Sequence, residues 1–255
     1  MHLMRKIFYI GYIQNLKPMN KFLLLSIIFF SFLSCNNEKM NNDIYIQGGG
    51  TLDDWANLSK YAESNNELKK QSIANRVVFM GNSITEGWSN FNPNFFIDNP
   101  FVNRGISGQT TPQMLIRFKP DVINLNPKAV VILAGINDIA GNTGPMKIEN
   151  ISENIFSMAE IAKANNIEVY ICSVLPAKDF PWSPGLNPSE KVVKLNNILE
   201  NYCKENNIKY VDYYSKMNDG NGGLKVPEFT SEDDLVHPNK QGYSVMESVI
   251  LSALD

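Results

Sequence analysis

The chain has 255 residues, 44% of them hydrophobic, which is enough for one sizeable α/β domain. Its net charge of -3, with 19% charged residues, leaves no basic stripe, so we expect no nucleic-acid partner. With 2 histidines and 3 cysteines the chain supplies few ligands for a transition metal, so we expect neither a metal nor another cofactor.

The N-terminal region has the pattern of an export signal. Residues 22–33 form an apolar run that is too short to span a bilayer but suits the core of a signal peptide. The run ends before Ser34 and Cys35 and resembles a bacterial lipoprotein signal, in which Cys35 would carry the lipid after cleavage. We therefore predict a signal peptide over residues 1–34, with Met19 as an alternative start. The protein would be anchored at the cell envelope of a bacterium, on the periplasmic or the outer side; the alternative is secretion.

A spacer and a helix are expected next. Residues 35–52 are rich in Asn and contain Gly48-Gly49-Gly50, so we predict a flexible tether. A helix over residues 53–72 is predicted because apolar residues recur there at helical spacing, namely Trp55, Leu58, Tyr61 and Ala62.

Apolar runs then alternate with helical patterns to the end of the chain. Strands are expected at residues 77–80, 101–103, 128–134, 167–174 and 209–213, and helices from Ser83, through Met114 and Phe118, and over 148–165, 189–206 and 241–254. Strands separated by helical crossovers require a parallel sheet with helices on both faces. We predict one α/β domain over residues 53–255 with a five-stranded parallel sheet.

Two cysteines fall within this domain. Cys172 lies in an apolar strand-like run, and Cys203 lies near the end of a helical segment. Buried free thiols behave as small hydrophobic groups, so we expect two free thiols; the alternative is a disulfide.

Ser83 is a candidate nucleophile. It lies in Gly81-Asn82-Ser83-Ile84-Thr85-Glu86-Gly87, where a predicted strand ends and a helix begins. Ligands bind at this edge of open α/β sheets, and the free N–H groups of a helix start favour negative charge. The alternative is structural, because Ser83 and Glu86 also have the spacing of a capping box.

His237 is the one histidine of the predicted mature chain, since His2 lies in the signal segment. It follows Asp234 by three residues, so one loop can present a carboxylate beside the ring. A serine hydroxyl needs a neighbouring base, and that base needs an orienting carboxylate. Ser83, His237 and Asp234 supply one of each. The alternative is a polar loop before a helix that begins at Pro238.

Three groups are candidates for an oxyanion hole. The backbone N–H groups of Ser83 and Gly108 and the side-chain amide of Asn137 would all come from strand ends at one edge of the sheet. Gly108 is otherwise a turn glycine, and Asn137 is otherwise a turn or cap residue.

Four segments, in this order, resemble the four blocks of the SGNH, or GDSL-type, esterases and lipases: Gly81-Asn82-Ser83-Ile84-Thr85, the Gly108 loop, Gly135-Ile136-Asn137-Asp138 and Asp234-Leu235-Val236-His237. The resemblance covers residues 76–255 and implies a flavodoxin-like α/β/α sandwich of three layers. It also implies Ser83 as nucleophile, His237 as base and Asp234 as its partner, with Ser83, Gly108 and Asn137 as the oxyanion hole. Asn82 departs from the family, which has Asp there; the amide keeps its hydrogen-bonding capacity but loses a charge.

The resemblance implies a metal-independent carboxylic-ester hydrolase that forms an acyl-Ser83 intermediate. We expect it to remove short acyl groups such as acetyl, because no long apolar segment that could form a lid is evident in the mature domain. The expected substrates are small-molecule or polysaccharide esters, including those of sialic-acid-like sugars, because aromatic residues of its loops can stack on sugar rings: Trp88, Phe91 and Trp182. The chain is also similar to platelet-activating-factor acetylhydrolases, so one alternative is a lysophospholipase with the aromatic residues along an acyl chain. A second alternative is a glycan-binding module that has kept the fold without turnover.

Overall fold

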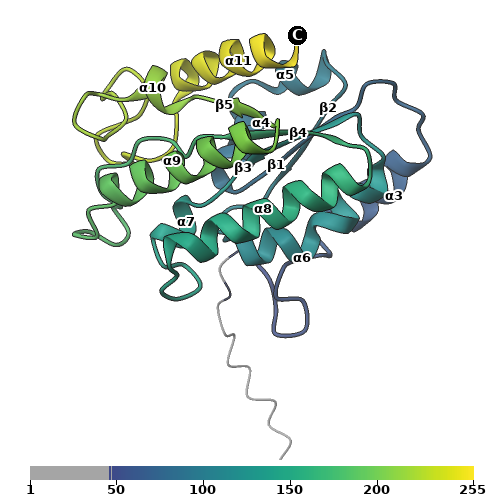
Figure 1. Cartoon of the computed structure of the whole chain (residues 1–255), viewed down its shortest axis with the longest axis horizontal. Helices are drawn as coiled ribbons and strands as arrows, with labels where there is room; N and C mark the ends of the chain where they lie inside the picture. Colours follow the sequence, from purple (N-terminus) through teal and green to yellow (C-terminus); the bar gives the residue numbers. More distant parts are fainter. Residues whose placement is uncertain (1–45, 47) are drawn as a thin grey trace, which may run out of the picture. The chain divides into compact units, whose positions relative to one another are not determined.

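The computed structural model describes residue 46 and residues 48–255. The predictions for the signal peptide, for Cys35 and for most of the tether fall outside the described residues. Within the described part, five parallel strands form one sheet in the order β2-β1-β3-β4-β5 (Figure 1). The strands are β1 (Val77–Gly81), β2 (Phe101–Gly105), β3 (Ala129–Leu133), β4 (Glu168–Cys172) and β5 (Lys209–Val211).

Helices cover both faces of the sheet, which confirms the predicted α/β/α sandwich (Figure 1). One layer contains α3 (Ala62–Lys69), α6 (Thr111–Asp121), α8 (Ile148–Ala164) and α9 (Ser189–Glu205). The other contains α4 (Ser83–Phe91) and α11 (Lys240–Leu254), with α5 (Pro93–Ile97) packed on α4 and α10 (Tyr214–Met217) on α11. The short helices η1 (Ile123–Leu125) and α7 (Ile136–Ile139) lie in connections. No helix of the described residues is long and apolar enough to cross a membrane.

The core explains the sequence pattern of the strands. Every residue of β1 and β3 is buried, as expected for central parallel strands with helices on both faces. The predicted free thiols are confirmed, because Cys172 and Cys203 are both buried and unbonded. Trp88 is also part of the core: its ring stacks on Phe95 with centroids 4.9 Å apart. The prediction of Trp88 as a loop aromatic that faces a ligand is therefore wrong.

The ends of three strands are level with one another. Gly81, the last residue of β1, pairs with Gly105 of β2 and with Leu133 of β3. Glycine is required at Gly105, because a Cβ atom there would lie 2.1 Å from the backbone nitrogen of Glu86. The first turn of α4 therefore packs directly against the end of β2.

The predicted helix over residues 53–72 is only partly present. Turns occupy the segment up to Tyr61, and α3 begins at Ala62. The carboxylate of Asp54 accepts hydrogen bonds from the backbone N–H groups of Leu58 and Ser59 at 2.7 and 3.0 Å, and Asn57 has a φ of 53°. These local interactions compete with helical hydrogen bonds, and the apolar periodicity in this segment does not reflect a buried face.

The described end of the predicted tether packs against the domain. Ile46 is buried, and the Gly48 carbonyl accepts a 2.8 Å hydrogen bond from the side chain of Asn57. A Cβ atom at Gly48 would lie 2.5 Å from Cγ of Gln109. The packed part of the chain therefore includes residues before position 53.

One buried carboxyl joins two loops at the sheet edge. Asp138 of α7 accepts hydrogen bonds from the backbone N–H of Thr111 at 3.0 and 3.1 Å and from its hydroxyl at 2.6 Å. Burial raises the pKa of Asp138 from 3.8 to about 6, although the hydrogen bonds from Thr111 oppose this shift. The carboxyl is thus partly protonated near neutral pH.

This pKa predicts a pH-dependent contribution to stability. The folded state holds the Asp138 proton up to about pH 6, whereas the unfolded chain releases it near 3.8, so the free energy of unfolding should fall as pH rises through this interval. Asp138→Asn has no such proton. Between pH 4 and pH 7 the difference in free energy of unfolding between the two proteins should move in favour of the variant by about 2 kcal/mol, measured by chemical denaturation. A difference that stays constant over this range would contradict the assigned pKa.

Candidate active site

Ser83 occupies the first position of helix α4. The preceding residue, Asn82, is the N-cap, and its side-chain oxygen accepts a 3.0 Å hydrogen bond from the backbone N–H of Ile84. An amide at position 82 therefore supplies the same capping acceptor as the aspartate of the family motif. Because Asn82 caps the helix, the hydroxyl of Ser83 is available for other contacts.

The capping-box alternative for Ser83 and Glu86 is wrong. Ser83 lies inside the helix rather than at its cap, and its Oγ contacts Nε2 of His237. The carboxylate of Glu86 points away from the helix start and accepts hydrogen bonds from Ser107 and Lys60.

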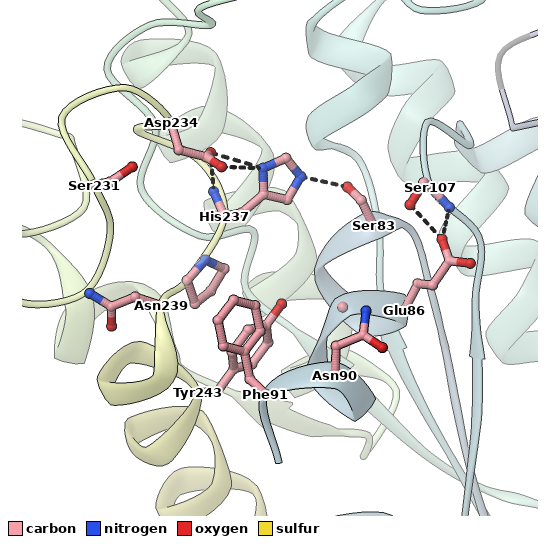
Figure 2. A pocket seen from close by; sticks show the side chains of 12 residues that line it. Ser83, Glu86, Asn90, Phe91, Ser107, Ser231, Asp234, His237, Asn239 and Tyr243 are labelled. Atoms are coloured by element: carbon pink, nitrogen blue, oxygen red, sulfur yellow. Dashed lines mark hydrogen bonds and ion pairs between the residues drawn. The ribbon is translucent and has the colours of Figure 1, made fainter. Parts of the chain in front are cut away.

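Ser83, His237 and Asp234 form one chain of hydrogen bonds (Figure 2). Ser83 Oγ lies 2.8 Å from His237 Nε2, and His237 Nδ1 lies 2.8 and 3.0 Å from the two carboxylate oxygens of Asp234. Ser83 and His237 are 154 residues apart in the sequence, and the fold brings their side chains together. All three are partly buried, so a ligand can reach them from solvent.

A strained turn presents the imidazole and the carboxylate together. Leu235, between the two residues, has a φ of 64°, an uncommon conformation for a branched side chain. In this turn Asp234 Oδ1 also accepts the backbone N–H groups of Val236 and His237 at 3.1 and 2.8 Å. The carbonyl of His237 accepts a 2.8 Å hydrogen bond from Thr230. The carboxylate is thereby held beside the ring.

The other two predicted site residues lie in the connections after β2 and β3, Asn137 within the short helix α7, and these two connections are tied to each other. The side-chain amide of Asn137 donates to the carbonyl of Gln109 at 3.0 Å, and that of Asn142 donates to the carbonyl of Gly108 at 3.0 Å. Both loops follow strands that flank β1, so Gly108 and Asn137 lie at the same sheet edge as Ser83. One N–H of the Asn137 amide is occupied, which leaves its second N–H for a ligand.

Arg117 is a site-supporting residue that the sequence analysis does not identify. Its guanidinium is fully buried and donates to the carbonyls of Gly81 and Arg104, at 2.8 and 2.9 Å, and to the side chain of Gln109. Asp121 balances its charge at 2.9 Å. Arg117 therefore joins the ends of β1 and β2 to the Gly108 loop. A signal for it exists in the sequence, because it interrupts the apolar stripe of α6 next to Phe118.

Two of the three predicted ligand-facing aromatic residues lie at the site. Phe91 is 46% exposed and borders the cavity beside Ser83. Trp182 is 47% exposed, and its ring centroid lies 6.1 Å from that of His237. Both rings can therefore contact a bound molecule.

Solved structures share this fold over most of the chain. A GDSL-like lipase from Bacteroides thetaiotaomicron VPI-5482 is 48% identical, with a TM-score of 0.75, and the match covers 78% of this chain and 97% of that one. A candidate acylhydrolase from Bacteroides fragilis NCTC 9343 is 50% identical with the same TM-score of 0.75, over 79% and 97% of the two chains. A variant of the acetyl-xylooligosaccharide esterase Axe2 from Geobacillus is 19% identical (TM-score 0.59; 72% and 96% covered) and shows the fold alone.

Sequence comparisons agree with the structural ones. An uncharacterized lipoprotein, YqeF, of Bacillus subtilis (strain 168) is 25% identical over 156 residues, which cover 54% of this chain. The match spans 64% of the length of that relative. The sequence model of the GDSL-like Lipase/Acylhydrolase family matches residues 79–245. The chain therefore belongs to the GDSL-like lipase/acylhydrolase family.

Proposed function

We propose that the protein is a serine carboxylic-ester hydrolase in which Ser83, His237 and Asp234 act as a catalytic triad. The observation that carries the proposal is the unbroken hydrogen-bond chain from the Ser83 hydroxyl through the imidazole to the carboxylate. Asp234 accepts the Nδ1–H of His237, which leaves Nε2 unprotonated and facing Ser83. Membership of an acylhydrolase family supports the same chemistry.

In the proposed reaction, Ser83 Oγ attacks the ester carbonyl carbon while its proton moves to His237 Nε2. The bond to the alcohol then breaks, and the proton on Nε2 passes to the leaving alcohol oxygen. Water deprotonated by Nε2 attacks the acyl-Ser83 ester, the free acid leaves, and the hydroxyl of Ser83 is restored. No step requires a metal or another cofactor.

We also propose that the backbone N–H groups of Ser83 and Gly108 and the free N–H of the Asn137 amide bind the developing oxyanion. The hydrogen bonds of the Gly108 and Asn137 loops to each other support this proposal, because they hold these donors in place before the substrate binds. We propose acetyl or similarly short groups as the acyl part.

The proposal predicts the behaviour of Ser83→Ala. The variant should lose at least roughly 10³-fold in kcat on p-nitrophenyl acetate, because no acyl-enzyme can form. Its thermal unfolding temperature should stay close to that of the wild type. Ser244→Ala is the matched control, since Ser244 is an exposed serine of α11 whose hydroxyl donates to the carbonyl of Lys240 in the same helix.

Turnover by Ser83→Ala at a rate similar to the wild type would refute the proposed nucleophile. The same assay on p-nitrophenyl esters from acetate to palmitate tests the acyl part. The wild type should hydrolyse acetate fastest, and a maximum at long chains would instead favour the lysophospholipase alternative.

We further propose that Cys35 carries a lipid that anchors the mature protein to a membrane. The support is the signal-like sequence that precedes Cys35 and the naming of the Bacillus subtilis relative as a lipoprotein.

In a bacterial host that processes lipoproteins, the wild type should sediment with the membrane fraction. Cys35→Ala should move to the soluble fraction or the medium, because the thiol that carries the lipid is absent. Immunoblots of the two fractions provide the measurement, and equal membrane association of both proteins would contradict the proposal.

A further inference from the structure

One face of helix α4 lines a cavity of about 630 Å³ beside Ser83 (Figure 2). The lining residues of α4 are spaced as neighbours on one side of a helix, at positions i, i+3, i+4, i+7 and i+8: Ser83, Glu86, Gly87, Asn90 and Phe91. The helix that presents the candidate nucleophile therefore also presents the groups that a bound substrate would meet next to it.

The remaining walls come from the Gly108 loop, through Ser107, from the loop of residues 231–238, here called the histidine loop, and from the start of α11. Gly87 leaves the cavity open down to Tyr243, because a Cβ atom at Gly87 would lie 3.1 Å from the Tyr243 hydroxyl. Ser107 lines the cavity beside Glu86, and its side chain is exposed (Figure 2). Among the described residues that line the cavity, none is Lys or Arg.

Glu86 places a fixed carboxylate in this cavity. Its Oε2 accepts a 2.7 Å hydrogen bond from the backbone N–H of Ser107 and another from the Ser107 hydroxyl, and its Oε1 accepts Lys60 Nζ. Partial burial works against the charged form, but the bonds from Lys60 and Ser107 outweigh it and hold the pKa of Glu86 below its ordinary value. Glu86 is therefore ionised at neutral pH, with its charge balanced by Lys60.

Lys60 lies outside the part of the chain that the family model matches. That match begins at residue 79, whereas Lys60 belongs to the segment before α3 and reaches Glu86 from outside the cavity. The neighbouring Tyr61 also contacts the site region, through a 2.5 Å hydrogen bond from its hydroxyl to the carbonyl of Gly105. The segment before α3 thus supports the wall that contains Glu86 from behind.

We propose that this cavity is the subsite for the alcohol part of the substrate, and that it takes an uncharged polyhydroxyl group such as a sugar, with Glu86 as the specificity-determining residue. The proposal rests on the proposed ester hydrolysis. It narrows the substrate to neutral alcohols and so disfavours both sialic-acid esters and lysophospholipids.

The position of the cavity identifies the alcohol part. The leaving alcohol takes its proton from His237 Nε2, and His237 borders the cavity. Gly108 and Asn137, the proposed binding groups of the carbonyl oxygen, do not border it. When the carbonyl oxygen of the ester is bound by the donors at Gly108 and Asn137, the alcohol part therefore lies in the cavity along α4.

The chemistry of the lining identifies a neutral polyol. A sugar hydroxyl can donate to the remaining lone pair of Glu86 Oε1, and the amide of Asn90 offers both donors and acceptors. The exposed ring of Phe91 presents an apolar face to a sugar ring. An anionic group would find no free cation to bind it, because the lining holds no Lys or Arg and Lys60 is paired with Glu86. A cationic group would gain little, because Glu86 is already paired with Lys60.

The test compares acetate esters whose alcohols carry different charges. The neutral ester is methyl 6-O-acetyl-glucopyranoside, the anionic one is 9-O-acetyl-N-acetylneuraminic acid, and the cationic one is acetylcholine. The wild type should show a kcat/KM on the neutral ester about tenfold or more above either charged ester, as expected for one charge-assisted hydrogen bond gained or lost. p-Nitrophenyl acetate is measured in parallel as a substrate with no sugar.

Two variants should move the selectivity in opposite directions. Glu86→Gln removes the negative charge, so the ratio of anionic to neutral kcat/KM should rise by about tenfold. Lys60→Met leaves the carboxylate uncompensated, so the same ratio should fall below that of the wild type. Glu67→Gln is the matched control, because Glu67 pairs with Lys70 on the exposed surface and should leave the ratio unchanged.

The outcomes separate this inference from the proposed function. If the wild type hydrolyses p-nitrophenyl acetate but uses the anionic ester as well as the neutral one, the subsite assignment is wrong and the esterase proposal stands. A Glu86→Gln variant with the ratio of the wild type would also overturn the role of Glu86. If the wild type hydrolyses none of the esters, the proposed function itself fails.

Discussion

The level pairing of β1 with β2 and β3 is the constraint on which the site depends. Gly81 lies beside Gly105 on one side and Leu133 on the other, so the loops that follow these strands start from one line at the sheet edge. Ser83, Gly108 and Asn137 each follow their strand within a few residues. Parallel strands with helical crossovers bring their carboxyl ends to the same edge. A shift of one strand would separate the proposed nucleophile from the proposed oxyanion donors.

The histidine loop reaches this edge through contacts between α11 and α4. Tyr243 of α11 donates from its hydroxyl to the carbonyl of Ile84 at 2.8 Å, one residue beyond Ser83. Farther along, Trp88 donates to Glu247 at 2.8 Å. These buried or half-buried hydrogen bonds hold the start of α11 against the start of α4. The imidazole therefore lies opposite Ser83 because hydrogen bonds join α11 to α4. Helix α4 also carries residues that line the proposed alcohol subsite.

Much of this arrangement can be predicted from the sequence. Alternating strand and helix patterns predict the sheet, and four short motifs predict which residues meet at its edge. The predictions fail where the same residue type suits both a ligand site and the core, or both a helix and a turn. Trp88 is polar-flanked and aromatic, which suits a ligand site, but its ring completes the core around Phe79. Where a helix is predicted, the hydrogen bonds of Asp54 and the positive φ of Asn57 form turns instead. The hydrogen bonds of Glu86 with Ser107 and Lys60 join residues that are far apart in the sequence, so no local pattern predicts them.

We propose that His237 makes the hydroxyl of Ser83 nucleophilic. Reaction of the intact protein with a fluorophosphonate, followed by mass spectrometry of its peptides, measures this property. We predict one covalent adduct per chain, on Ser83, and labelling slower by roughly 10² or more in His237→Ala because the base is lost. An unlabelled protein that still binds sugars, or an adduct on another residue, would contradict it and would fit a glycan-binding module without turnover.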